Sequence, residues 1–202
     1  MEHITNQVIL RGSLKQLPEF SHENHGRQFY RFELQVRRLS GAIDSLPIIA
    51  ESTLLEAIDL SGGEMIAVTG QIRSHNLRVG GHRRLLIFVF ATTVAAEDGD
   101  PVNHVLLEGP LCREPNYRCT PLGREICDAM LAVPRAFGRA DYIPCILWGR
   151  TAQEIADCHT RDLIRVCGRL QSRRYTKQTD DGPVERIAYE VSALNAEYIP
   201  EN

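Results

Sequence analysis

Apolar and polar residues alternate along much of the chain, most clearly over residues 163–194. The first part of this stretch gathers its most apolar positions on one face, which we expect to point inward: Ile164, Val166, Gly168 and Leu170. Thr179–Pro183 is dense in turn formers, and Arg186–Val191 then alternates again. The pattern predicts a long β-hairpin with several cations and Tyr175 near its tip.

The same alternation predicts three shorter strands and a closing hairpin in each half of the chain. In the first half these are Asn6–Leu17, Gln28–Arg38, Asp44–Ala50, and Glu64–His75 with Arg83–Ala95. In the second half they are Asn103–Cys112, Arg124–Val133, Asp141–Trp148, and Asp162–Tyr175 with Val184–Ala193. A short helix is expected before each hairpin, at Thr53–Asp59 and Thr151–Cys158, because Thr and Glu stand at capping-box spacing at both places.

The two halves are related by an internal repeat. Asn6–Phe20 is echoed by Asn103–Tyr117, and Met65–Ser74 is echoed by Leu163–Ser172, in the same order along the chain. We therefore predict two domains, residues 1–96 (repeat one) and 103–199 (repeat two), joined by a polar linker at 97–102. The predicted class is all-β: two tandem five-stranded OB-fold barrels, each with one short helix between strands three and four.

Composition narrows the class further. The 202 residues carry a net charge of -3, so any surface that attracts a polyanion must be a local one. The sequence has no apolar run of about 20 residues and no basic segment followed by an apolar core at its start, so we expect neither a membrane span nor a signal peptide. The six cysteines include no C-x-x-C pair, and we interpret them as reduced thiols of a cytoplasmic protein, nucleoid- or mobile-element-associated. Because the common catalytic and metal-binding motifs are missing, we expect no enzyme activity, no cofactor and no metal.

Repeat two resembles the bacterial single-stranded DNA-binding protein (SSB) family. The resemblance covers about residues 103–194 and depends on an ordered set of short segments: Asn103–Pro115, Thr120–Gly123, Leu131–Arg135, Asp141–Pro144, Leu147–Ala152, Gly168–Tyr175 and Arg186–Val191. Repeat one matches more weakly, and it has Ser45 and Glu51 where repeat two has Tyr142 and Trp148. The resemblance implies an OB fold that binds single strands by stacking and by backbone charge.

The resemblance also implies a set of contact residues. Bases stack on aromatic side chains, and the residues at matching positions are Trp148, Tyr175, Tyr142 and Phe137. For Trp148 a place in the core is the alternative, and for Tyr189 the core is the favoured interpretation. The cations expected to contact phosphates are Arg135, Arg139, Arg169, Arg173, Arg174 and Lys177, with Arg73 and Arg37 from repeat one. Their alternative is a solvated face.

The hypothesis for function is sequence-tolerant binding and protection of single-stranded DNA in replication, repair or recombination. The expected partners are single-stranded DNA and a second copy, since a homodimer of two-barrel chains gives the four OB folds that the resemblance implies. The family's acidic tail is missing from the printed sequence, so we do not expect partners that bind through it. The alternatives are an SSB-like adaptor of a primosome or conjugation system with weak nucleic-acid binding, and an RNA-binding protein.

Overall fold

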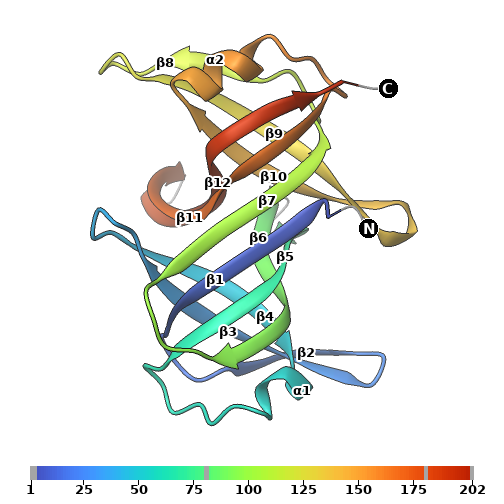
Figure 1. Ribbon diagram of the computed structural model, residues 1–202, viewed down its shortest axis with the longest axis vertical. Coiled ribbons are helices and arrows are strands. Elements are labelled where there is room, and N and C mark those ends of the chain that lie inside the picture. Colours follow the sequence, from blue (N-terminus) through green and yellow to red (C-terminus); the bar gives the residue numbers. More distant parts are fainter. Residues whose placement is uncertain (1–3, 80–81, 180–181, 201–202) are drawn as a thin grey trace.

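The computed structural model describes residues 4–79, 82–179 and 182–200 and has the predicted all-β architecture. Repeat one contains β1 (Asn6–Leu14), β2 (Glu19–Asn24), β3 (Arg27–Arg37), β4 (Ile43–Glu51), α1 (Ser52–Leu55), β5 (Met65–Val79) and β6 (His82–Ala96). Repeat two contains β7 (Val102–Pro110), β8 (Asn116–Cys119), β9 (Glu125–Arg135), the 3₁₀ turn η1 (Ala136–Gly138), β10 (Arg139–Trp148), α2 (Arg150–Ala156), β11 (Leu163–Thr179) and β12 (Gly182–Ile199). The same order of elements occurs twice, and the two halves lie one above the other (Figure 1).

Each repeat has the five expected strands and one short addition. β2 and β8 occupy segments predicted as loops, and each pairs with the strand that follows it. Each barrel closes through a short parallel pair, Ile48 with Val89 in repeat one and Cys145 with Val191 in repeat two. Among the described residues the strands form one sheet of 12, whose order places β1 beside β7 at its centre.

Glycine allows the strands to cross closely where the barrels bend. A Cβ atom on Gly168 would lie 2.3 Å from the carbonyl oxygen of Ser192, and one on Gly70 would lie 2.3 Å from that of Phe90. Real Cβ atoms do not approach backbone this closely, so a side chain there would force the strands apart. Both positions coincide with a register shift between the hairpin strands, as expected where a strand bends.

The two barrels are joined edge to edge by their first strands. β1 and β7 pair antiparallel from Asn6 with Leu107 to Arg11 with Val102. Val8 and Val105 face each other across this pair, and both are fully buried. One continuous hydrophobic core therefore extends through both repeats.

The helices are shorter than predicted and are capped differently. α1 begins after Glu51 and α2 after Gly149, and neither has a side-chain cap. The capping-box prediction is therefore wrong, because each helix starts at the residue before its Thr, which places the Thr inside the first turn and not at the N-cap. Glu154 instead accepts a hydrogen bond from Arg150 Nε at 2.9 Å. Within the described part of the chain, no helix has the length and apolarity needed to cross a membrane.

Candidate nucleic-acid interface

The outer face of β10 carries two exposed aromatic side chains. Ile143, Cys145 and Leu147 point into the core, so the alternate positions of the strand point outward. Tyr142 is 45% exposed and Trp148 is 39% exposed, which places Trp148 outside the core. They are six residues apart on one strand, which corresponds to about 20 Å.

Phe137 lies next to this face, in the turn between β9 and β10. Its side chain is 98% exposed, and its backbone has a left-handed φ of 61°. An aromatic ring held so fully in water contributes nothing to the core, so this position is compatible with a ligand contact.

Tyr175 projects from the hairpin of repeat two rather than from β10. It is 38% exposed, and the guanidinium carbon of Arg173 lies 5.7 Å from its ring centroid. Arg173 in turn pairs with the buried carboxylate of Glu190, Nε to Oε1 at 3.2 Å. The cation thus holds one side of the Tyr175 ring while the ring stays partly open to solvent.

A groove between the two repeats, which we call the inter-repeat groove, includes one of these aromatic side chains, Tyr175. Its volume is about 930 Å³, and it includes Tyr175 and Lys177 from β11. It also includes Pro144, which shares the outer face of β10 with Tyr142 and Trp148. The aromatic face of β10 therefore continues into the inter-repeat groove.

Cations from both repeats meet in this groove. Arg84 of repeat one lines it together with Lys177 and Arg186 of repeat two, and none of the three has an ion-pair partner among the described residues. Tyr189 lies at the same place: it packs against the core, and burial, with Glu33 as the next cause, raises the pKa of its phenol. The sequence favoured a core position for Tyr189, and the structure shows that the residue also lines the groove.

The predicted phosphate-binding cations differ in their surroundings. Arg37, Arg139, Arg174 and Lys177 are exposed, and the described residues offer them no ion pair. Arg73 and Arg135 instead bind the buried carboxylate of Asp141, each with a closest nitrogen–oxygen distance of 3.2 Å. Arg169 is half-buried, and its Nε has no hydrogen-bond partner in the described structure.

Repeat one lacks an equivalent aromatic face. Ser45 stands at the Tyr142 position and donates a hydrogen bond to Glu33 at 2.6 Å. Phe32 is buried, and Tyr30 packs edge-on against Phe20. Phe20 is 55% exposed, and among the described residues of repeat one it is the only aromatic side chain that is exposed.

The sequence alone did not indicate the apolar floor of the groove. Leu86, Phe88 and Ile187 belong to that floor, although strand alternation alone would assign them to a core or to solvent. Their position depends on how one barrel packs on the other, which alternation within a strand does not specify. A signal that could have found the groove is the presence of Arg84 and Arg186 at equivalent positions of the two hairpins.

The structure is that of a tandem OB-fold protein in which two aromatic side chains are exposed on the outer face of β10. The model of the single-strand binding protein family matches residues 102–199. Single-stranded DNA-binding protein B of Bacillus subtilis (strain 168) is 37% identical over 83 residues, which cover 38% of this chain and 74% of that protein. The chain belongs to the single-strand binding protein family.

Two further comparisons, one with a sequence relative and one with a solved structure, cover different shares of this chain. The single-stranded DNA-binding protein of Bacillus cereus is 38% identical over 84 residues, so this chain spans about half (49%) of its length. The crystal structure of the wild-type single-stranded DNA binding protein from Thermus aquaticus aligns with a TM-score of 0.80 at 24% identity, over 98% of this chain and 94% of that one. The resemblance in fold thus extends over both repeats, whereas the match to the Bacillus proteins covers 38% of this chain.

Proposed function

We propose that the protein binds single-stranded DNA with little sequence preference. The observation that carries the proposal is the outer face of β10, where Tyr142 and Trp148 stand exposed on a strand whose other face is core. Base stacking on aromatic rings is worth about 1–3 kcal/mol per base and tolerates any sequence. The names of the Bacillus relatives support the same ligand.

The proposed path follows β10 and then enters the inter-repeat groove. Bases stack on Trp148 and Tyr142, which lie on either side of Pro144, and the DNA enters the groove along Pro144 to reach Tyr175. Phosphates lie against the cations that border this path: Arg139 and Arg174, with Lys177, Arg186 and Arg84 in the groove. Protection of single strands during replication, repair or recombination is the proposed role.

The test uses the single tryptophan of the chain. A dT35 oligonucleotide is titrated at low salt while Trp148 fluorescence is recorded, and we expect strong quenching that weakens as salt is added. Unchanged fluorescence at saturating DNA would remove Trp148 from the site and refute the proposed path. A matched RNA oligonucleotide in competition decides between DNA and RNA as the preferred ligand.

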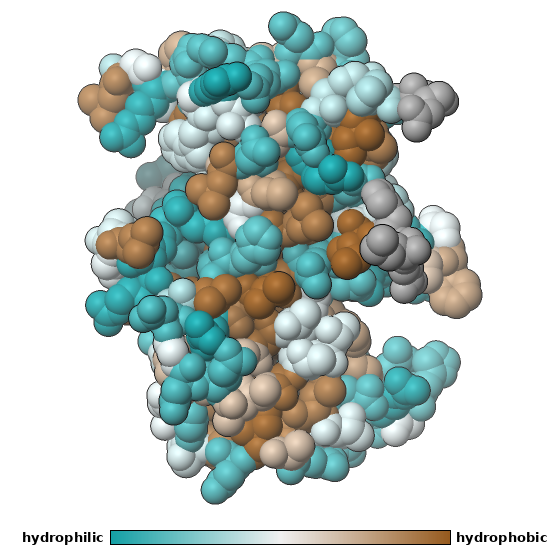
Figure 2. Space-filling view, in the orientation of Figure 1, coloured by the Kyte–Doolittle hydropathy of each residue, from teal (hydrophilic) through white to brown (hydrophobic). Residues whose placement is uncertain are grey.

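We also propose that two chains associate, which gives four barrels. Apolar residues gather over the central strands on the face shown in Figure 2, and Ile9 on the central strand β1 is 36% exposed. A stable contact between copies would cover such a surface. Solution mass measured with and without dT35 reports association and binding together, and a monomeric mass in both samples would contradict the proposal.

The lack of aromatic residues at the stacking positions of repeat one favours a second candidate function, that of an adaptor that binds other proteins. Ser45 and Glu51 occupy the stacking positions of repeat one, so that repeat offers little to a base. Binding of dT35 only at micromolar or weaker affinity, together with co-purification of a replication or conjugation protein, would support the adaptor.

A further inference from the structure

The two barrels hold each other through a reciprocal pair of buried aspartates. We use the name aspartate lock for Asp44 with Ser172 and for Asp141 with Ser74. The side chains of Asp44 and Asp141 are both 0% exposed. Asp44 accepts a hydrogen bond from the backbone N–H of Ser172 at 2.8 Å, and Asp141 accepts one from the backbone N–H of Ser74 at 2.7 Å. Each barrel thus buries a carboxylate that binds the hairpin of the other barrel.

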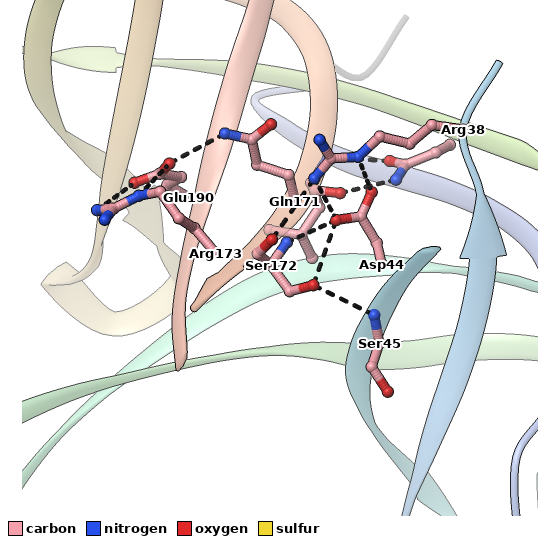
Figure 3. A network of polar contacts seen from close by, with 9 residues as sticks. Arg38, Asp44, Ser45, Gln171, Ser172, Arg173 and Glu190 are labelled. Carbon is pink, nitrogen blue, oxygen red and sulfur yellow. Dashed lines mark hydrogen bonds and ion pairs between the residues drawn. The ribbon is translucent and has the colours of Figure 1, made fainter. Parts of the chain in front are cut away.

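Arginines neutralise both carboxylates. Arg38 donates to Asp44 from Nε at 2.7 Å, and the hydrogen bond to Asp44 raises the pKa of Arg38. Figure 3 shows this half of the lock, in which Ser172 lies between Asp44 and the backbone of Ser45. Two arginines, Arg73 and Arg135, bind Asp141 in the other half. Buried carboxylates that are paired and hydrogen-bonded in this way fix a specific geometry.

The Asp141 half of the lock reaches the aromatic face directly. The backbone N–H of Tyr142 donates to Ser74 Oγ at 2.7 Å. β10 pairs with β9 along its whole length but with β12 only at Cys145 and Ile146. At Tyr142 one edge of β10 therefore has no strand partner. The hydroxyl of Ser74 accepts the hydrogen bond from the backbone N–H of Tyr142 instead. The start of the aromatic face is held by the hairpin of repeat one.

The Asp44 half makes the same contact next to a residue that cannot stack. The backbone N–H of Ser45 donates to Ser172 Oγ at 3.3 Å, and Ser45 occupies the position of Tyr142. The two halves of the aspartate lock thus make nearly the same hydrogen bonds, but one half holds Tyr142 and the other holds Ser45.

We propose that Ser74 is a positioning residue for single-stranded DNA binding: the hairpin of repeat one, through Ser74 and Asp141, sets the orientation of Tyr142 toward the bases. The inference rests on the proposed function and adds a specific role for repeat one. Repeat one thus contributes to DNA binding by holding the backbone of Tyr142 in repeat two, and it does not need stacking groups of its own. Loss of the Ser74 hydroxyl leaves the amide of Tyr142 without its acceptor and loosens this end of β10.

A double-mutant cycle on the full chain tests the proposal, with dT35 affinity measured by Trp148 fluorescence. We expect Ser74→Ala to weaken binding by roughly three- to tenfold, within the range of couplings between residues in contact. Tyr142→Ala should weaken it by about five- to 150-fold, the equivalent of one lost stacking contact. The double variant should bind as Tyr142→Ala does, because Ser74 acts through Tyr142.

Ser172→Ala is the matched control, since it removes the equivalent hydroxyl next to Ser45. Its effect should be independent of Tyr142→Ala, so the two fold-changes multiply. Ser74→Thr keeps the hydroxyl and should restore most of the affinity. If Ser74→Ala does not fold, Ser74→Cys replaces it in the cycle, since it keeps the size of the side chain and weakens the acceptor.

The outcomes separate this inference from the proposed function. If Tyr142→Ala weakens binding, but the fold-changes of Tyr142→Ala and Ser74→Ala simply multiply in the double variant, the positioning role is wrong and the proposed function stands. Wild-type affinity in the folded Ser74→Ala variant would likewise overturn the positioning role alone. If Tyr142→Ala leaves dT35 affinity unchanged, the proposed stacking path is wrong and the positioning role falls with it.

Discussion

Arg84 provides the sharpest test of the inter-repeat groove, because it belongs to the repeat without aromatic residues at the stacking positions, yet it lines the groove together with Tyr175. Its side chain is exposed, and among the described residues it has no carboxylate partner, so its charge is available to a phosphate. Loss of one contact to a single strand lowers the slope of log affinity against log salt by about 0.7. Arg84→Ala should therefore weaken DNA binding most at low salt. The ratio of wild-type affinity to variant affinity should decrease by about 2.6-fold between about 50 and 200 mM salt.

The control is Arg78→Ala, which removes the same charge from the same hairpin at an exposed position outside the groove. Fluorescence titrations with dT35 at four or five salt concentrations give the slopes of the wild type and both variants. We expect a changed slope for Arg84→Ala and an unchanged one for Arg78→Ala. Equal slopes for both variants would show that only overall charge matters and would refute a strand path through the groove.

Three further changes have defined outcomes. Tyr175→Ala should weaken dT35 binding by about 1–3 kcal/mol, whereas Leu77→Ala at the equivalent position of repeat one should change it little, and equal losses in titration would argue that both barrels bind alike. Gly168→Ala should lower the free energy of unfolding by about 1–3 kcal/mol in chemical denaturation, because its Cβ would meet Ser192 O at 2.3 Å; an unchanged midpoint would contradict that close approach. Hydrogen bonds from Ser61, then from backbone N–H groups, lower the pKa of Glu64 from 4.5 to about 2, so its stabilisation is present above pH 4.5 and is lost as pH falls through about 2. The gap in melting temperature between wild type and Glu64→Gln should accordingly be present at pH 7 and close near pH 2, and a constant gap would contradict this account.

Strand alternation and the internal repeat were sufficient to predict both barrels. The inward positions of the second hairpin, such as Ile164 and Val166, are fully buried. These features depend on residues near each other in a strand or at equivalent places in the repeat, which a single sequence displays directly. β2 was missed because its short run Glu19–Asn24 is almost entirely exposed and has no alternation to reveal it.

How the two barrels pack against each other could not be predicted from the sequence. Asp44 and Asp141 were visible as equivalent positions, but their burial depends on a hairpin that approaches from the other repeat. Arg73 and Arg135 were predicted as phosphate contacts on local grounds, and the structure pairs both with Asp141. Charge near a hairpin predicts a cation on the surface, yet only the packing of the barrels decides whether a buried carboxylate is within reach.

The antiparallel pairing of β1 with β7 has a consequence for how the two halves can diverge. In a symmetric dimer of single-barrel chains, one substitution appears on both sides of the interface and both binding faces change together. Here the pairing joins two segments of the same chain, Asn6–Arg11 and Val102–Leu107, so each half is encoded separately. Tyr142 and Ser45 can occupy equivalent positions with different side chains, and one half can specialise while the other keeps only the contacts that hold the pair together.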